Sequence, residues 1–245
     1  YDGTVAHPNG EASSDRQVGT SAFNSTWNGN TYVGYMYGNA SASTYELTHN
    51  NSGGNSTIKT YLETWYRNNL LNTEYEEYIA DTVYCNDRTL STASTYTGIG
   101  TTTSYYAPYQ RIWNTYSPVL TCTRVEDRFA VGTSVGGIET NGKNKDTSNN
   151  EYRVGLITAD EVMLGGGKGS TANYRYYLVN GYNYYWTMSP SYYQGSYASA
   201  ISVNSSGYIN SSSVDNINGV RPAISLNSSA LTSGSGTMSD PYRVS

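Results

Sequence analysis

Hydrophobic and polar positions follow a helical pattern most clearly in the segment that begins after Ser56. Apolar side chains recur there at intervals of three and four residues, as at Ile58, Leu62 and Tyr66, which places them on one face of an α-helix. Ser56 suits the N-cap because its hydroxyl can accept a hydrogen bond from a backbone N–H of the first turn. The pattern predicts an amphipathic helix from Thr57 to Leu70 with its apolar face on the core.

The charged residues of this segment predict the opposite face of the helix. Lys59, Glu63 and Arg67 lie four residues apart, so they line one side, and we expect that side to be solvated. A second, shorter helix is predicted over residues 73–80, where TEYEEYIA stands just before Cys85.

A strand that leads directly into a helix is predicted after Tyr152. VGLIT (residues 154–158) has the apolar composition of a strand, and ADEVML follows it. Thr158 as N-cap and Glu161 three residues later form a capping box. The acidic pair of Asp160 and Glu161 is therefore assigned to helix capping and dipole compensation rather than to acid–base catalysis.

The segment from Tyr185 onward has the two-residue period of a β-strand. Trp186 and Met188 alternate with Tyr185 and Thr187, which predicts a strand with one buried face. Pro190 is expected to end this strand, because proline cannot donate a hydrogen bond to a neighbouring strand.

Turn-forming residues separate these elements. Gly and Asn are frequent in residues 1–37, which predict short strands, and in residues 127–150, which predict a loop or hairpin. Residues 86–118 are also rich in turn signals, so little regular structure is expected there. The patterns predict an α+β protein with small twisted antiparallel sheets, about two short helices and long loops, folded as a single domain over residues 1–245 with a strand-and-loop portion over residues 1–54.

Composition adds a preference for tyrosine. The chain has 27 Tyr and 4 Trp but 2 Phe, and only 13% of its residues are charged. Disordered chains lack aromatic residues, so a folded protein is expected. Tyrosine suits exposed recognition surfaces because it combines an apolar ring with a hydroxyl, but β propensity alone explains most of the 27.

Charge disfavours two kinds of partner. The net charge is −5 and no run of Lys and Arg forms a basic stripe, so we expect no nucleic-acid binding and no binding to anionic membranes. No apolar run approaches the ~20 residues that span a bilayer. Because the chain begins at Tyr1, without an initiator Met or a signal peptide, we expect a processed ectodomain that reaches a membrane only through an anchor missing from this chain.

Two cysteines leave one possible pairing, between Cys85 and Cys122. In an exported protein this pair is expected to form a disulfide. The spacing is not that of a zinc site, and the two histidines, His7 and His49, have no motif around them, so neither a metal nor another cofactor is expected.

The C-terminal block resembles the end of a C-type-lectin-like fold. The pattern consists of YWTMSP (185–190), ISVNSSGYI (201–209) and GVRPAISL (219–226), in that order. It is similar to the branch shared by formylglycine-generating enzymes and the variable proteins of diversity-generating retroelements. Upstream segments resemble Firmicutes surface proteins, some with pilin-like anchors, and the resemblance extends from Asn55 to the C-terminus.

The chemistries of that branch do not carry over to this chain. Formylglycine-generating enzymes use late cysteines, and none follows Cys122; related iron enzymes use a histidine cluster, which is lacking here. Calcium motifs of sugar-binding C-type lectins and a GxSxG motif are also missing. We therefore expect a protein without catalytic residues.

The resemblance implies a binding face on the last strands and loops, where Tyr gives rigid contact area and Ser and Asn give adaptable hydrogen bonds. The expected partner is a protein or glycan on another cell or surface, and the expected location is extracellular or at the cell surface. A structural or tip subunit of a pilus-like filament, which assembles with itself, and an enzyme of unknown type are the alternatives. The residues predicted for the binding face are Tyr192, Tyr193, Gln194, Ser196, Tyr197, Ser199, Tyr208 and Asn210.

Overall fold

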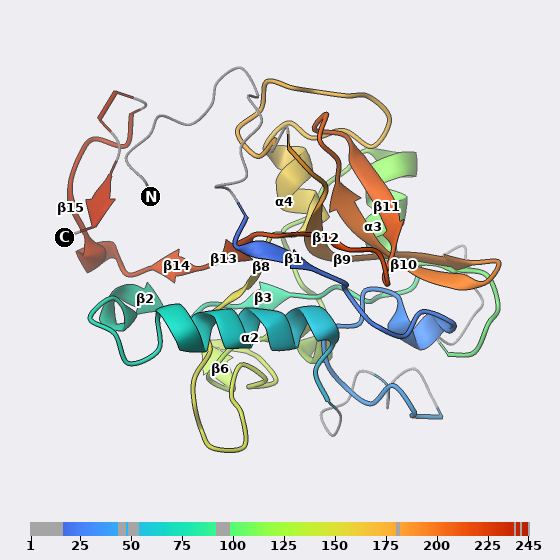
Figure 1. Cartoon of the computed structure of the whole chain (residues 1–245), viewed down its shortest axis with the longest axis horizontal. Coiled ribbons are helices and arrows are strands. Elements are labelled where there is room, and N and C mark those ends of the chain that lie inside the picture. Colours follow the sequence, from blue (N-terminus) through green and yellow to red (C-terminus); the bar gives the residue numbers. More distant parts are fainter. Residues whose placement is uncertain are drawn as a thin grey trace.

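The computed structural model describes residues 17–43, 48, 54–91, 99–179, 182–237, 239–240 and 242–244. The two histidines weighed as metal ligands, His7 and His49, lie outside the described residues. The described part is an α+β structure of small, mostly antiparallel sheets, short helices and long loops, which confirms the predicted class (Figure 1). Its α-helices are α2 (Thr57–Asn69), α3 (Ala107–Gln110) and α4 (Ala159–Leu164).

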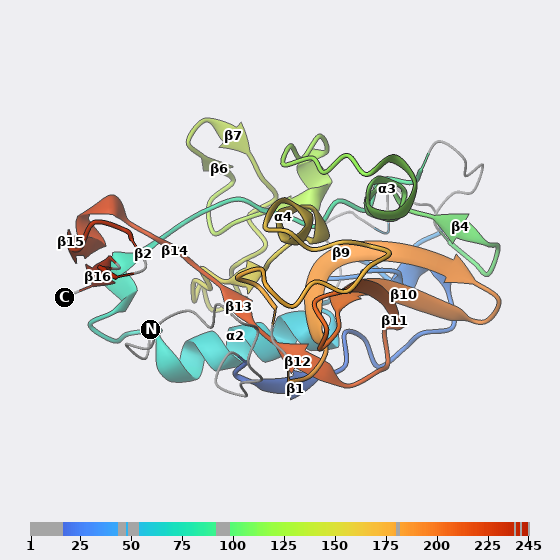
Figure 2. The ribbon, with the colours of Figure 1, turned by 90° about the horizontal axis from the view of Figure 1, so that it is seen from above.

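The largest sheet is built around the long strand β9. All its pairings are antiparallel except the one between β12 and β9, where Gly219 pairs with Tyr185 in parallel. Figure 2 shows α2 on one side of β9 and α3 with α4 on the other. In spatial order the strands are β1 (Gly19–Ser21), β12 (Asn218–Val220), β9 (Tyr185–Gln194), β10 (Tyr197–Val203) and β11 (Ile209–Ser213), and β4 (Ser104–Tyr105) also pairs with β9.

Small two-stranded pairs surround this sheet. Of the loop or hairpin predicted for residues 127–150, the structure forms a hairpin, β6–β7, which turns at Gly136 and Gly137. The helix predicted over residues 73–80 is wrong: a 3-10 turn, η3 (Glu76–Tyr78), is followed by a strand. The pairs are β2 (Ile79–Ala80) with β14 (Ser225–Leu226), β3 (Tyr84–Cys85) with β5 (Arg128–Phe129), β6 (Ser134–Val135) with β7 (Ile138–Glu139), β8 (Gly155–Leu156) with β13 (Pro222–Ala223), and β15 (Leu231–Ser233) with β16 (Arg243–Val244).

The strand predicted from Tyr185 is confirmed, but β9 is buried on both faces rather than on one. Trp186 and Met188 belong to the core on the α2 side, and Tyr185 packs in a second cluster with residues of α4 and β10. Pro190 does not end the strand but lies within it, opposite Ala200, where the register with β10 shifts. An irregular pairing of this kind accommodates a residue that lacks an N–H group.

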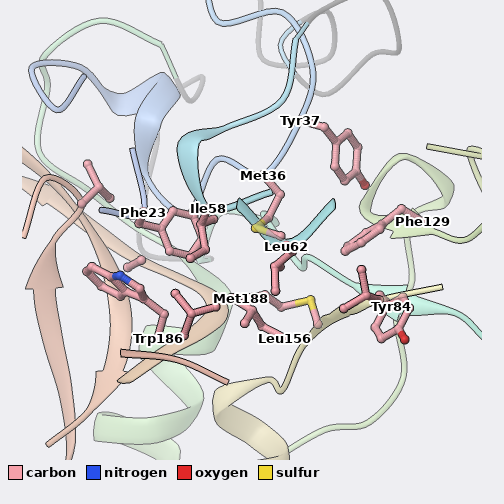
Figure 3. Packing of buried hydrophobic residues seen from close by; sticks show 14 of the residues in the cluster. Phe23, Met36, Tyr37, Ile58, Leu62, Tyr84, Phe129, Leu156, Trp186 and Met188 are labelled. Atoms are coloured by element: carbon pink, nitrogen blue, oxygen red, sulfur yellow. The ribbon is translucent and has the colours of Figure 1, made fainter. Parts of the chain in front are cut away.

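The main core joins α2 to the sheet (Figure 3). Ile58 and Leu62 of α2 point into it, as the helical pattern predicts, and Ser56 caps the helix by accepting a hydrogen bond from the Lys59 N–H at 3.1 Å. Phe23 meets the indole of Trp186 edge to face, with ring centroids 5.4 Å apart. The predicted helix and its N-cap are therefore confirmed.

The predicted solvated face of α2 is only partly correct. Arg67 is exposed, but Lys59 is 2% and Glu63 9% exposed. The backbone around Lys143 covers this side of the helix, and its carbonyl accepts a hydrogen bond from the Lys59 amine at 3.0 Å. A helical wheel cannot reveal such a cover, because the covering segment comes from elsewhere in the chain.

The disulfide predicted between Cys85 and Cys122 is present, with 5.8 Å between the Cα atoms. It ties β3 to a segment without regular structure that follows Pro118. Among the described residues, no helix is long and apolar enough to cross a membrane.

The capping box predicted at the start of α4 is also present. The Thr158 hydroxyl accepts a hydrogen bond from the Glu161 N–H at 3.1 Å, and the Glu161 carboxylate accepts one from the Thr158 N–H at 2.7 Å. The variant Glu161→Ala is expected to lower the free energy of unfolding by about 1 kcal/mol, because one of these two bonds is lost. Urea denaturation measures the change, and Glu139→Ala on the exposed strand β7 is the control. Equal losses in both variants would contradict this role of the capping box.

Candidate functional site

Five aromatic rings form a continuous row on the surface beside the β9–β10 hairpin, and we call this row the aromatic ladder. Successive ring centroids lie 4.8–6.5 Å apart, within the range of favourable ring–ring contact. Four of the rings are half-buried and the last, Tyr197, is 40% exposed. The members are Trp113, Tyr109, Tyr105, Tyr192 and Tyr197.

Strand pairing fixes the middle of the ladder. Tyr105 of β4 lies directly opposite Tyr192 of β9 in an antiparallel pair, so the two side chains stand on the same face of the sheet. Their ring centroids are 5.9 Å apart. The next residue, Tyr193, points to the opposite face and into the main core. Because successive side chains of β9 point to opposite faces, Tyr192 lies in the ladder and Tyr193 lies in the core.

Helical spacing supplies the other end of the ladder. Tyr105, Tyr109 and Trp113 are four residues apart, and α3 continues as a π-helical turn, η4 (Arg111–Thr115). Residues four apart lie on one side of a helix, which places Tyr109 next to Trp113, with ring centroids 4.8 Å apart. Tyr105 belongs to β4, just before the helix, and its ring centroid lies 5.0 Å from that of Tyr109. Pro108 stands in the first turn of α3, where its missing N–H costs no hydrogen bond.

Ion pairs hold the helix of the ladder in place. The Arg111 guanidinium donates two hydrogen bonds to the Asp160 carboxylate, at 2.6 and 2.9 Å, and lies 2.9 Å from an oxygen of Asp87. Such bidentate contacts fix the orientation of the guanidinium as well as its position. Asp160, assigned from the sequence to helix capping, thus anchors Arg111, and Glu161 alone completes the capping box.

The indole of Trp113 is fixed in the same way. Its Nε1–H donates a hydrogen bond of 2.6 Å to the carbonyl oxygen of Gly169. A Cβ atom at Gly169 would lie 2.8 Å from a methyl carbon of Ile112, so only glycine allows this close approach. The ring is therefore held in one orientation before any ligand arrives.

Two tyrosines of the ladder stay uncharged at neutral pH. Burial, reinforced by a hydrogen bond with Tyr197, raises the pKa of Tyr192 to about 12. Burial also raises the pKa of Tyr109, with a smaller contribution from nearby Tyr105. Both phenols consequently stay protonated and can donate hydrogen bonds. The surface can offer ring faces and hydroxyl groups to an uncharged ligand.

The structure brings together four of the eight residues predicted for the binding face. Tyr192 and Tyr197 belong to the ladder, and Gln194 and Ser196 are exposed at the turn between β9 and β10. This turn passes through Gly195, whose φ of +72° favours glycine.

Two of the predicted residues do not lie on the surface. Tyr193 is 2% exposed in the main core, and Ser199 is fully buried in β10. Their assignment to an exposed face is corrected here. The sequence suggested exposure because Tyr and Ser are common on recognition surfaces, but the side of the hairpin that carries Tyr193 and the middle of β10 that carries Ser199 are covered.

The remaining two predicted residues lie apart from the ladder. Tyr208 is half-buried, and its N–H donates to the side chain of Asn204, at the end of β10 opposite to Tyr197. Asn210 lines an open depression of about 590 Å³ that Tyr197 also borders. Most of the other side chains around this depression are amides and hydroxyls from β11 and the residues that follow it. This polar depression therefore adjoins the ladder at Tyr197, its exposed end.

Sequence reasoning missed Tyr105, Tyr109 and Trp113. Their regular spacing of four residues in YYAPYQRIW was the available signal. It was hidden by Pro108 and by the turn-rich composition on either side, which together favoured an irregular segment.

A cavity of about 300 Å³ lies behind Arg111 and extends to the disulfide at Cys85. Its acidic residues are engaged in the fold: Asp160 also accepts the Val119 N–H at 3.0 Å, and Asp87 accepts the Thr89 N–H at 3.2 Å. Within the described ranges, no group of three or more His, Cys, Asp or Glu side chains is placed to hold a metal ion.

Comparison with known families finds one similarity. Residues 120–228 match the family model described as a domain of unknown function (DUF6273). The match covers just under half of the chain and includes α4, β9, β10 and β11, but not α2 or α3. No curated protein and no solved structure matches the chain. The family description supplies no activity, so the geometry must support any functional proposal.

Proposed function

We propose that this protein is a non-catalytic, extracellular recognition protein that binds a protein or glycan ligand through the aromatic ladder. The observation that carries the proposal is the row of five partly exposed aromatic rings, fixed from below by strand pairing, ion pairs and the Trp113 hydrogen bond. The disulfide between Cys85 and Cys122 supports an oxidising, extracellular location.

The energetics of recognition support the same surface. Tyr and Trp are the residues that most often dominate binding energy, because they bury much area while losing little conformational freedom. Here the rings are already held in place, so binding orders few side chains. The exposed polar residues of the hairpin turn, Gln194 and Ser196, and the amide of Asn210 lie where they can supply hydrogen bonds around the apolar centre.

We also propose that the fold is C-type-lectin-like and that the chain is related to variable proteins of diversity-generating retroelements. The pairing of β1, near the start of the described chain, with the late strand β12 supports this proposal, as does the succession of β9, β10 and β11. Sequencing the neighbouring DNA tests the relationship. A reverse-transcriptase gene and a near-copy of the 3′ coding segment that differs at adenines are expected, and their absence would contradict it.

Alanine substitution on the ladder tests the binding proposal. Labelled protein is applied to a panel of immobilised glycans and extracellular proteins, and the variant Tyr192→Ala/Tyr197→Ala is expected to lose roughly 10- to 100-fold in apparent affinity for the members that the wild type binds. The matched control is Tyr174→Ala/Tyr177→Ala, which removes two exposed tyrosines outside the ladder. Circular dichroism verifies that each variant is folded.

Two results would contradict the proposal. The first is a wild-type protein that binds no member of the panel. The second is a folded ladder variant that binds as tightly as the control variant.

A further inference from the structure

A lysine, a glutamate and an asparagine form a connected group at the start of α2, on the side predicted to be solvated. The Lys59 amine donates a hydrogen bond to Oε1 of Glu63, and the Asn55 amide donates one of 2.7 Å to Oε2 of the same carboxylate. One carboxyl group thus bridges an amine and a carboxamide. Neither the proposed binding surface nor the helix cap uses this arrangement.

The backbone holds all three residues in place. Lys59 and Glu63 lie on consecutive turns of α2. Asn55 precedes the helix and forms a β-bridge with Tyr37, and the next N–H, from Ser56, bonds to the Met36 carbonyl at 2.8 Å. The backbone thus keeps both side chains on the same carboxylate, so they need not diffuse together to react.

The surroundings favour a neutral amine. The Lys59 ammonium lies 5.9 Å from the ring centroid of Phe129 and is almost completely buried. Burial lowers the pKa of Lys59 below its ordinary value, although the Glu63 carboxylate partly offsets this effect. Transfer of one proton from Lys59 to Glu63 replaces two buried charges with a free amine and a carboxylic acid.

We propose that Lys59 and Asn55 form an intramolecular isopeptide bond, with Glu63 as the group that transfers the proton. The neutral Nζ attacks Cγ of Asn55 after giving a proton to Glu63. The carboxylic acid of Glu63 then donates this proton to Nδ2, the Cγ–Nδ2 bond breaks and ammonia leaves. The second amine proton passes to the released ammonia. The products are therefore one new Nζ–Cγ amide, one ammonium ion and the regenerated Glu63 carboxylate, so no oxidant or other reactant is consumed.

The position of Asn55 suits such a reaction. Its residue is exposed whereas Lys59 is buried, so the ammonia is released on the solvent side. An amide is exchanged for another amide, and dilution of the ammonia drives the exchange forward. The bond would close a short covalent loop across the N-terminus of α2. It would fix the direction in which the chain enters the helix.

Intact-mass spectrometry of the reduced and denatured full chain tests the proposal. The wild type is expected to weigh less than its sequence by one ammonia molecule. Trypsin is expected not to cut after Lys59, which leaves a single peptide from Gln17 to Arg67. Succinimide formation at an asparagine also loses ammonia but leaves Lys59 cleavable, so the two readouts together are specific.

Variants assign the roles of the three residues. Lys59→Arg and Glu63→Gln are expected to have their full sequence masses. Lys145→Arg, which replaces a lysine paired with Glu151 at a more exposed site, is expected to keep the ammonia loss. A wild type with its full sequence mass, or one cut after Lys59, overturns the proposal even if a variant fails to fold. Bond formation in Glu63→Gln overturns the role of Glu63.

Discussion

Trp186→Ala is expected to lower the free energy of unfolding by about 3–5 kcal/mol, the range for removing a large aromatic side chain from a packed core. Trp186 is fully buried at the centre of the main sheet. Its indole packs against Phe23, and its Nε1–H donates a hydrogen bond of 2.9 Å to the Ser21 carbonyl. The substitution leaves both a cavity and an unpaired carbonyl, and it loosens β1 from β9.

Urea denaturation followed by circular dichroism measures this loss. Trp27→Ala is the matched control, because Trp27 is an exposed residue of the same type. The control is expected to change the free energy of unfolding by about 0.5 kcal/mol or less. Similar losses in the two variants would show that Trp186 does not occupy the core described here.

Cys85→Ser/Cys122→Ser is expected to lower the free energy of unfolding by about 3–4 kcal/mol, since the disulfide closes a long loop in the unfolded chain. The two cysteines are separated by 37 positions. The segment that carries Cys122 has no regular structure and is otherwise held by hydrogen bonds from Arg128 to the carbonyls of Cys122 and Thr123, at 2.7 and 3.0 Å. Without the disulfide, this segment is expected to open before the rest of the protein.

Reduction of the wild type provides the control for this pair of substitutions. A reducing agent is expected to bring the wild type to the stability of the double-serine variant and to leave the variant unchanged. Wild-type stability that is the same in oxidising and reducing buffers would contradict the stabilising role of the disulfide.

Local sequence signals predicted the parts of the structure that depend on neighbouring residues. The helix α2 with its Ser56 cap, the capping box of Thr158 and Glu161, and the β6–β7 hairpin all follow from residues a few positions apart. The disulfide followed because two cysteines allow a single pairing.

Features that depend on distant residues were not predictable in the same way. Lys59 is buried because residues near Lys143 cross the side of α2, and Tyr193 is buried because β9 has partners on both faces. The residues next to these positions in the sequence do not indicate which distant segments cover them. The ladder itself joins β4, α3, η4 and the β9–β10 hairpin, which are far apart in the sequence, and the register of Tyr105 with Tyr192 brings β4 beside β9.

The proposed recognition function rests on whether a ligand covers the aromatic ladder, and hydroxyl-radical footprinting measures this directly. The probe is the panel member that binds the wild type most tightly, added at saturation. Labelling of Tyr192, Tyr197 and Trp113 is expected to fall, while labelling of the exposed Tyr174 and Tyr177 is expected to stay unchanged. Unchanged labelling of the ladder, with protection elsewhere, would contradict the proposal that this surface binds the ligand.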